Sequence, residues 1–217
     1  MFVKERMSHP VITAYPDTSL QEAMHLLQSE HIRRLPVVDK HGELVGIVTD
    51  HDLLRASPSD VTSLSVWEIG YLLSKITLEK VMIRDVVTID ENTPIEEAAC
   101  IMADHKFGAL PVTSGKDLVG IITDTDIFKV FMELFNAREA GVRVTALVKN
   151  EPGQLSRLSK AIYDAGGNII AMGTYRGPTP AEDVIMLKVD GVDAFELDRV
   201  ILPNTIAILD IRQMPGV

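Results

Sequence analysis

The stretch Leu44-Val45-Gly46-Ile47-Val48-Thr49-Asp50-His51-Asp52 decides the fold, because it occurs twice. With two changes it returns as Leu118-Val119-Gly120-Ile121-Ile122-Thr123-Asp124-Thr125-Asp126. Each copy is an apolar, β-branched run that passes into Thr-Asp-x-Asp. This pattern predicts a buried strand that ends where a helix begins.

The repetition extends in both directions from this stretch. At an offset of 75, residues 7–37 fall on 82–112, so that Met7 meets Met82 and Leu35-Pro36-Val37 meets Leu110-Pro111-Val112. A one-residue deletion then changes the offset to 74. The first 135 or so residues therefore form two copies of one unit.

Each copy has the order strand, helix, strand, strand, helix. In copy one, Ser19-x-x-Glu22 fits a capping box, and an apolar stripe follows at helical spacing. In copy two, we expect Thr93 to be the N-cap and Pro94 the first helical residue. The next two strands of copy one, 35–38 and 44–48, should form a hairpin around the turn 39–42.

The stretch 64–80 joins the copies. Leu64, Trp67, Tyr71 and Leu72 recur at a spacing that predicts one face of a short helix. We expect the single tryptophan to pack between the copies and to carry no chemistry.

The remaining residues follow a different pattern. Strands are predicted at 142–148, 168–172, 184–189 and 205–211, and helices at 155–163 and 193–200. The order βαββαβ predicts an antiparallel sheet with helices on one face, a ferredoxin-like arrangement. The fold class is therefore α+β.

Composition and charge limit the function. The 217 residues carry a net charge of -10, which argues against a protein whose main work is to grip nucleic acid. A lone cysteine, Cys100, excludes an internal disulfide. The charged start (1–6) does not resemble a signal peptide, and no apolar run has the length of a membrane span, so we expect a cytoplasmic protein.

The negative charge is uneven along the chain. Residues 1–141 carry 13 Lys and Arg against 22 Asp and Glu, whereas residues 142–217 carry 8 against 9. This shift indicates a domain boundary near 140–141.

The repeated Thr-Asp-x-Asp corner is the main candidate for chemistry, and two interpretations remain open. Thr49 could donate to a phosphate while Asp52 accepts the hydroxyls of a ribose, and Thr123 and Asp126 would do the same in copy two. Alternatively, both pairs are capping boxes with Asp in place of Glu.

The two copies differ in charge just before their Leu-Pro strand. Copy one has the adjacent cations Arg33 and Arg34, which could bind phosphate or form a solvated charge cluster. Copy two has 106–109 (Lys-Phe-Gly-Ala) instead, so two sites would not be equivalent. The six histidines form no HxxxH or HExxH pair, and we expect Cys100 to be a buried thiol.

Two loops in the last part of the chain have candidate roles. The turn 150–155 (Asn-Glu-Pro-Gly-Gln-Leu) precedes a helix whose free N–H groups could hold a carboxylate, although the sequence alone favours a plain strand-to-helix turn. Residues 176–182, with Gly and two Pro, are expected to form a mobile loop.

These motifs resemble two known families. Met7, the Leu-Pro-Val strands and the Gly-Ile-x-Thr-Asp-x-Asp corners resemble a tandem pair of CBS motifs, a Bateman module. The motifs 151–155 and 166–169, with the βαββαβ order, resemble an ACT domain. We expect CBS motif 1 at 7–56, a linker with a short helix at 57–80, CBS motif 2 at 81–131 and the ACT domain at 142–212. The domain order is similar to that of the AcuB family of acetoin-utilisation proteins.

The resemblance implies ligand sites for adenosine-containing compounds between the CBS motifs, and for a small effector in the ACT domain. No cofactor is required; AMP, ADP, ATP or S-adenosylmethionine would be regulatory ligands. The residues implied for CBS site 1 are Ile12, Thr13, Ala14, Arg34, Pro36, Thr49 and Asp52. Those implied for CBS site 2 are Val87, Thr88, Ile89, Pro111, Thr123 and Asp126. Those implied for the ACT effector, often an amino acid, are Gly153, Gln154, Leu155, Asn168 and Ile169.

The expected function is that of a non-catalytic, homodimeric sensor that changes its affinity for an unidentified protein partner and acts in acetoin or central carbon metabolism. One alternative is a dimerisation or assembly module with vestigial clefts. Another is an enzyme of acetoin breakdown, which has little support because no nucleophile, metal or cofactor motif occurs. Neither nucleic acid nor a membrane is an expected partner.

Overall fold

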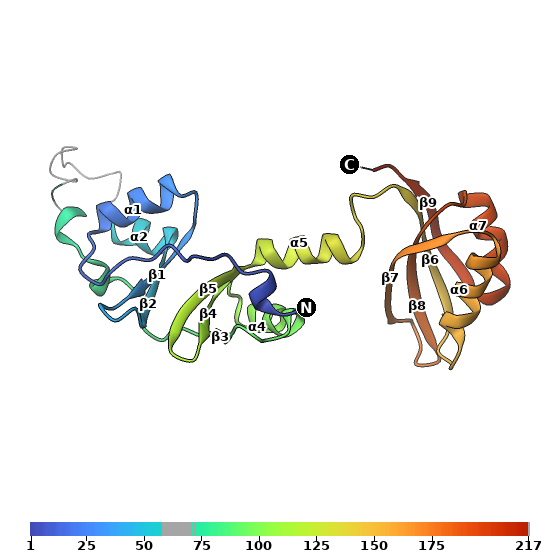
Figure 1. The fold of residues 1–217 in the computed structure, drawn as a ribbon, viewed down its shortest axis with the longest axis horizontal. Coiled ribbons are helices and arrows are strands. Elements are labelled where there is room, and N and C mark those ends of the chain that lie inside the picture. Colours follow the sequence, from blue (N-terminus) through green and yellow to red (C-terminus); the bar gives the residue numbers. More distant parts are fainter. Residues whose placement is uncertain (58–70, 72, 217) are drawn as a thin grey trace. The chain divides into compact units, whose positions relative to one another are not determined.

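The computed structural model describes residues 1–57, 71 and 73–216. The chain divides into two compact units, unit 1 (Met1–Ile127) and unit 2 (Phe128–Val217), and the boundary falls inside helix α5 (Asp124–Leu134). Figure 1 shows the elements of each unit. The expected helix face of Leu64, Trp67 and Leu72 lies outside the described residues, and Tyr71 is helical but exposed.

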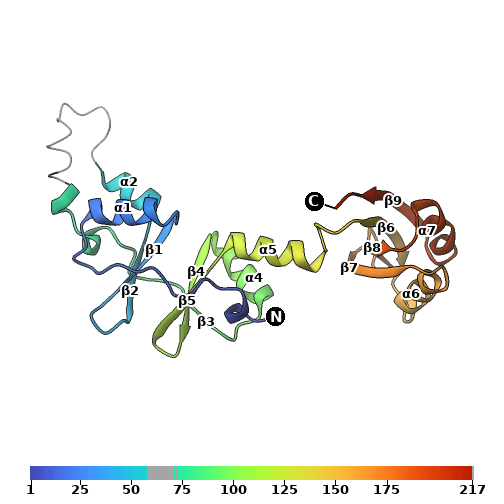
Figure 2. The ribbon, with the colours of Figure 1, turned by 45° about the horizontal axis from the view of Figure 1, so that its top comes forward.

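The first copy folds as the sequence predicts. Ala14 forms a parallel bridge with Val37, and β1 pairs with β2 as an antiparallel hairpin whose turn contains Gly42 at a φ of 84°. Figure 2 shows α1 and α2 side by side over this hairpin. The elements are η1 (Val3–Glu5), α1 (Leu20–Ser29), β1 (Arg34–Val38), β2 (Leu44–Thr49) and α2 (Asp50–Ala56).

Helix α1 begins at the predicted capping box. The Ser19 hydroxyl accepts from the Glu22 N–H, and the Glu22 carboxylate accepts from the Ser19 N–H. The Ser19 backbone and hydroxyl, which both donate to that carboxylate, hold the pKa of Glu22 below its ordinary value. This short local pattern therefore fixes where the helix starts.

The second copy repeats the arrangement with one difference at its first helix. The expected N-cap at Thr93 is wrong: the N-cap is Pro94, without a side-chain cap bond. The Ile95 N–H donates instead to the carbonyl of Met1, so the N-terminal segment supplies the acceptor. The elements are η2 (Leu78–Lys80), β3 (Ile89–Asp90), α4 (Ile95–His105), β4 (Ala109–Ser114), β5 (Asp117–Thr123) and α5.

The two copies exchange their leading segments, residues 3–8 and 78–83. The first segment pairs with copy two, where Ser8 bridges Ile121, and the second pairs with copy one, where Ile83 bridges Ile47. The side chains of Val3 and Leu78, at equivalent places in these segments, are fully buried. Unit 1 is therefore one interlocked body, because each copy completes the other.

One expected core residue is on the surface. Cys100 is exposed, so the prediction of a buried thiol is wrong. The buried face of α4 consists of Ile95, Ala98 and Met102, which lie three and four residues apart. Cys100 falls between these positions and faces away from the core.

Unit 2 is a four-stranded antiparallel sheet in the order β7-β8-β6-β9, with two helices. The predicted βαββαβ order is confirmed. Leu158 and Ile162 of α6, with Leu197 and Ile201 of α7, pack against alternate residues of β6 and β8. The elements are β6 (Gly141–Lys149), α6 (Gln154–Asp164), β7 (Asn168–Arg176), β8 (Glu182–Asp190), α7 (Ala194–Ile201), η3 (Leu202–Asn204) and β9 (Ala207–Met214).

Candidate functional site

The corner between β2 and α2 is a capping box. The Asp52 Oδ2 atom accepts from the Thr49 N–H at 3.0 Å and from the Thr49 hydroxyl at 2.7 Å, and the Asp52 N–H donates to that hydroxyl oxygen at 3.2 Å. The capping interpretation of this pair is confirmed. All three bonds use Oδ2 and the Asp52 backbone, so the cap does not occupy the other carboxylate oxygen.

The corner between β5 and α5 has the same geometry. Thr123 donates to Asp126 Oδ2 from its N–H at 3.1 Å and from its hydroxyl at 2.8 Å. Asp126 is more deeply placed than Asp52, with 8% of its surface exposed. A buried carboxylate with such partners holds the helix start firmly in place.

We predict that Thr123→Ala lowers the free energy of unfolding of unit 1 by about 1 kcal/mol, because the N-cap hydroxyl is lost. The neighbouring Thr125→Ala is the matched control. Thr125 is exposed and its hydroxyl reaches only Asp124, so a change within about 0.5 kcal/mol is expected. Urea unfolding followed by circular dichroism measures both variants. Equal losses in the two would contradict the capping role.

A cleft of about 230 Å³ opens beside the Thr49 corner. Most of its wall is apolar, and its polar groups are Thr49, Arg34, Lys106 and Asp85. The volume is below the roughly 300–1,000 Å³ of pockets that enclose a whole ligand, so this cleft encloses only part of a nucleotide-sized molecule. The lining residues are Arg34, Ile47, Thr49, Ile83, Asp85, Val86, Val87, Lys106, Phe107, Gly108, Ala109 and Pro111.

The cleft combines residues of both copies. Thr49 and Arg34, expected in one site, line it together with Val87 and Pro111, which were expected in the other. This grouping follows from the exchanged segments, because the bridge between Ile47 and Ile83 brings the start of copy two alongside the Thr49 corner.

The other candidate residues of unit 1 are not among those lining this cleft. Ala14, Pro36 and Ile89 are buried, Ile12 and Thr13 are half-buried, and Thr88 is exposed. Asp52 lies at the start of α2, one turn beyond Thr49. Sequence reasoning missed the cleft residues Lys106, Phe107 and Gly108 as partners of Thr49, although it had noted them as a difference between the copies.

The cleft carries two cations and one anion. Arg34 is half-buried, and its guanidinium forms neither a hydrogen bond nor an ion pair with the described residues. Lys106 is exposed and adopts a left-handed backbone at a φ of 57°. The anion is Asp85, which is exposed. A half-buried guanidinium without a partner is suited to an anionic ligand group, because bidentate pairing with a carboxylate or phosphate offsets its partial desolvation.

A second hollow, also of about 230 Å³, lies in unit 2 at the start of α6. Gly153, Gln154 and Leu155 line it, as does Asp183 of β8. Asn168 and Ile169 do not: Asn168 pairs with Asp190, at the far end of the strand pair from Asp183. That separation is roughly 20 Å at 3.3 Å per residue. One chain therefore brings together only the first three of the expected effector residues.

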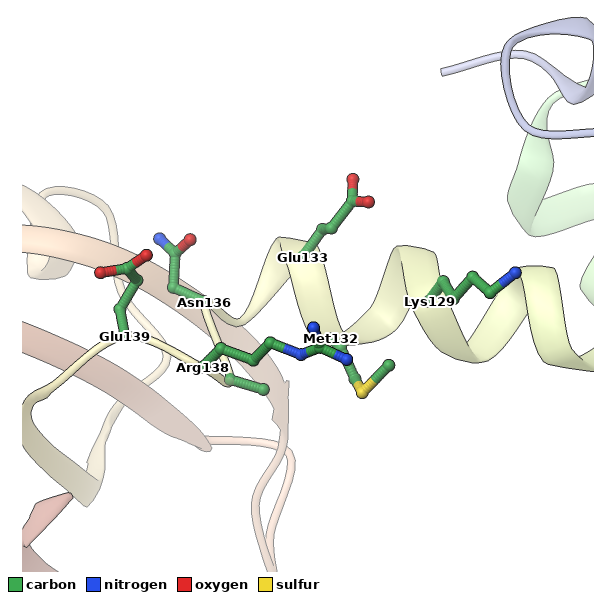
Figure 3. A pocket seen from close by; sticks show the side chains of 7 residues that line it. Lys129, Met132, Glu133, Asn136, Arg138 and Glu139 are labelled. Atoms are coloured by element: carbon green, nitrogen blue, oxygen red, sulfur yellow. The ribbon is translucent and has the colours of Figure 1, made fainter. Parts of the chain in front are cut away.

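A third hollow, of about 470 Å³, lies along the last turns of α5 and the segment after it. Lys129, Glu133, Arg138 and Glu139 line it, so cations and anions are mixed. Figure 3 shows these side chains spread along the helix and the segment after it, without converging on one point. This hollow therefore offers no defined ligand site.

Among the residues that the structure describes, no three His, Cys, Asp or Glu side chains gather in a way that could hold a metal ion. No helix in the same residues combines the length and the apolar character needed to span a membrane.

Two curated relatives each match about 60% of the chain. A CBS domain-containing protein of Dictyostelium discoideum is 36% identical over 138 residues, which are 62% of this chain and 93% of that protein. The L-aspartate semialdehyde sulfurtransferase of Methanocaldococcus jannaschii is 35% identical over 130 residues, which are 59% of this chain. The chain spans only 23% of the length of that enzyme.

Solved structures give the same picture. A CBS domain pair in complex with 5′-methylthioadenosine and S-adenosyl-L-methionine is 34% identical, with a TM-score of 0.51 over 60% of this chain and 95% of that one. A Vibrio cholerae protein assigned to acetoin utilization (AcuB) is 34% identical, with a TM-score of 0.52 over 62% and 92%. The protein CBSX2, in complex with AMP, is 28% identical, with a TM-score of 0.50 over 60% and 96%.

The family model named "CBS domain" matches residues 3–59 and 78–133, more than half of the chain. Both matches begin at the exchanged segments that contain Val3 and Leu78, which agrees with the interlocked fold of unit 1. Together with the repeated Thr-Asp-x-Asp corners and the cleft beside the first of them, this match shows that the chain belongs to the CBS domain family.

Proposed function

We propose that this protein is a regulatory sensor that binds adenosine-containing nucleotides in its CBS pair. One observation carries the proposal: the cleft beside Thr49 joins an apolar wall to Arg34, a cation without a partner in the described residues. An apolar wall suits a purine ring, and a guanidinium suits a phosphate. The relatives solved with AMP and with S-adenosyl-L-methionine support this ligand class.

The roles of the corner residues remain part of the proposal. Asp52 would accept the ribose hydroxyls through the oxygen that the cap does not use, and Thr49 would face a phosphate. Asp126 and Thr123 would contact a ribose and a phosphate in a second cleft, which the pseudo-symmetry of the copies implies. A carboxylate that already caps a helix is held in one orientation, which suits it to a bidentate contact with two hydroxyls.

Unit 2 is proposed to be a ferredoxin-like ACT domain. Its βαββαβ order and its hollow at Gly153–Leu155 support this assignment. An amino acid effector would place its carboxylate at the start of α6, where the N-cap residue Gly153 supplies no side-chain acceptor. Because Asn168 and Ile169 lie at the far end of the sheet, they would join this site only from a second copy, as in a homodimer.

The output of the sensor is proposed to be a ligand-dependent affinity for a protein partner, without catalysis by this chain. The likeness to the Vibrio cholerae protein supports a role in acetoin or central carbon metabolism. Residue bounds of 7–56 and 81–131 for the CBS motifs, and of 142–212 for the ACT domain, are retained as predictions, as is a cytoplasmic location.

We predict that adenosine nucleotides raise the melting temperature of the full chain, because a ligand that binds only the native state stabilises it. At 100 times the dissociation constant, the gain is about 2.7 kcal/mol. A calorimetric and thermal-shift screen should contain AMP, ADP, ATP, NAD, S-adenosylmethionine and the twenty amino acids. Asp52→Ala and Asp126→Ala should each reduce the shift. If no adenosine compound stabilises the protein at millimolar concentration, the proposal fails.

The same variants separate the sensor from an assembly module with vestigial clefts. One observation favours the assembly module: the capping boxes explain the presence of Asp52 and Asp126 at the helix starts without any ligand. In that case Asp52→Ala would lose only the cap, about 1 kcal/mol, and partner binding would not depend on nucleotide. Purified protein that turns over acetoin would instead support an enzyme.

A further inference from the structure

Arg34 reaches from the first copy to the backbone of the second, at Gly108. A Cβ atom built on Gly108 would lie 1.8 Å from Arg34 Nη2 and 2.8 Å from Arg34 Cζ. No side chain can share that space, because real contacts of a Cβ atom are longer than 3.0 Å. The guanidinium can hold this position, against the backbone of residue 108, only because that residue is a glycine.

The backbone at Gly108 is part of the second corner. Its carbonyl accepts from the Asp124 N–H at 3.1 Å, just as the carbonyl of Arg33 accepts from the Asp50 N–H at 3.0 Å in copy one. Position 108 is therefore held in place by the start of α5. The counterpart of Gly108 in copy one is Arg33, which is exposed, so this device occurs on one side of the pair only.

The cleft around the Arg34 guanidinium contains one further cation and one anion. Lys106 lines the same cleft, and Asp85 is the acidic side chain of its lining. Asp124 Oδ2 lies 3.2 Å from the position of the built Cβ atom, so a carboxylate also borders Gly108. Arg34 nevertheless forms no ion pair within the described residues. The donors of the guanidinium are therefore available to a ligand.

We propose that Gly108 and Arg34 make this cleft selective for adenosine that carries a phosphate over adenosine compounds that carry none. The inference rests on the proposed function and adds the preference for a phosphate and the glycine on which that preference depends. Gly108 acts as a positioning residue, because the missing side chain leaves the space that the Arg34 guanidinium occupies. Arg34 supplies the charge-assisted hydrogen bonds to the phosphate, and the apolar wall holds the base irrespective of the phosphate.

The test compares AMP with adenosine on the full chain. Chemical-shift titration of the Val87 and Ala109 amides, both in the cleft lining, reports binding at this cleft alone. We expect the wild type to bind AMP at least about tenfold more tightly than adenosine, the effect of one hydrogen bond to a charged group. In Gly108→Ala the ratio should fall to about threefold or less, while the affinity for adenosine is kept.

Three further variants make the test decisive. Arg34→Met should lose the preference to the same extent, and Gly108→Ala combined with Arg34→Met should lose no more than either alone, because both changes remove one contact. Arg33→Met is the matched control: it removes the neighbouring, exposed arginine and should leave the ratio unchanged. Gly108→Ala is expected to fold, because the atom that must move is the far end of a flexible side chain.

Each outcome decides between the two proposals. If adenosine and AMP bind the wild type equally, the selectivity is overturned and the nucleotide sensor stands. If neither ligand shifts any amide, the proposed function itself fails. If Arg34→Met loses the preference for AMP while Gly108→Ala keeps it, the role of Gly108 is overturned. If Arg33→Met also loses the preference, it depends on the overall positive charge, and the specific role of Arg34 is overturned. Should Gly108→Ala not fold, the comparison of Arg34→Met with Arg33→Met still decides the role of Arg34.

Discussion

Replacing Leu35 by Ala is expected to lower the free energy of unfolding of unit 1 by about 2–5 kcal/mol. Leu35 lies in β1 and is fully buried in a cluster with Leu20, Val48 and Leu53. Truncation removes the transfer free energy of the lost methyl and methylene groups and leaves a cavity between α1, α2 and the hairpin. Such a loss is a large fraction of the stability of a domain of this size.

The equivalent change in the second copy tests whether unit 1 unfolds as a whole. Leu110 corresponds to Leu35 and is also fully buried. Because the copies exchange their leading segments, Leu35→Ala and Leu110→Ala should lower the melting temperature of the same calorimetric transition. The matched variant in unit 2, Leu158→Ala, should lower the melting temperature of a different transition. Separate transitions for the two copies would contradict the interlocked fold, even if both variants lose the expected stability.

Gly46→Ala is expected to destabilise unit 1 by about 1–3 kcal/mol, the cost of overpacking a closed site. A Cβ atom at this position would lie 2.6 Å from Met82 Sδ and 3.1 Å from the backbone carbonyl oxygen of Ile83. The carbonyl cannot withdraw freely, because it accepts from the Ile47 N–H at 2.9 Å. The substitution therefore strains the bridge that carries the start of copy two.

Gly120→Ala is the matched control for this prediction, since Gly120 is the equivalent glycine of copy two. There the three nearest atoms to a built Cβ all belong to the side chain of Met7, which is less buried than Met82. A flexible side chain at a partly open site can move aside, so the loss should be smaller than for Gly46→Ala. Chemical unfolding of the two variants gives the comparison, and an equal or larger loss for Gly120→Ala would contradict it.

Local patterns predicted most of the secondary structure. The capping boxes at Ser19 and Thr49, and the hairpin turn that ends at Gly42, depend on residues no more than a few positions apart. Over so few residues the backbone has few alternative conformations, because caps and turns provide hydrogen bonds for backbone groups that have no other partner. The N-cap expected at Thr93 was wrong because a distant backbone, at Met1, meets the start of that helix.

The candidate site was predictable only in part. The resemblance to CBS motifs implied Thr49, Arg34, Val87 and Pro111 as ligand residues, and the structure places all four at one cleft. The grouping of these four residues in one cleft was not predicted, because two of them were assigned to CBS site 1 and two to CBS site 2. Nothing in the sequence indicated that Gly108 contacts Arg34. A side chain at position 108 is excluded only because the folded chain brings the Arg34 guanidinium next to it.

By itself the sequence determined that this chain contains two copies of one unit, where the strands and helices of those copies lie, and which polar residues stand at their corners. These features follow from periodicity and from short-range hydrogen bonding. The tertiary structure decided which copy supplies which part of the cleft. It did so because the leading segments cross over: the antiparallel bridge of Ile83 with Ile47 carries Val87 to the Thr49 corner, some forty positions away in the chain. Hydrogen bonds between segments so far apart leave no pattern in the residues between them.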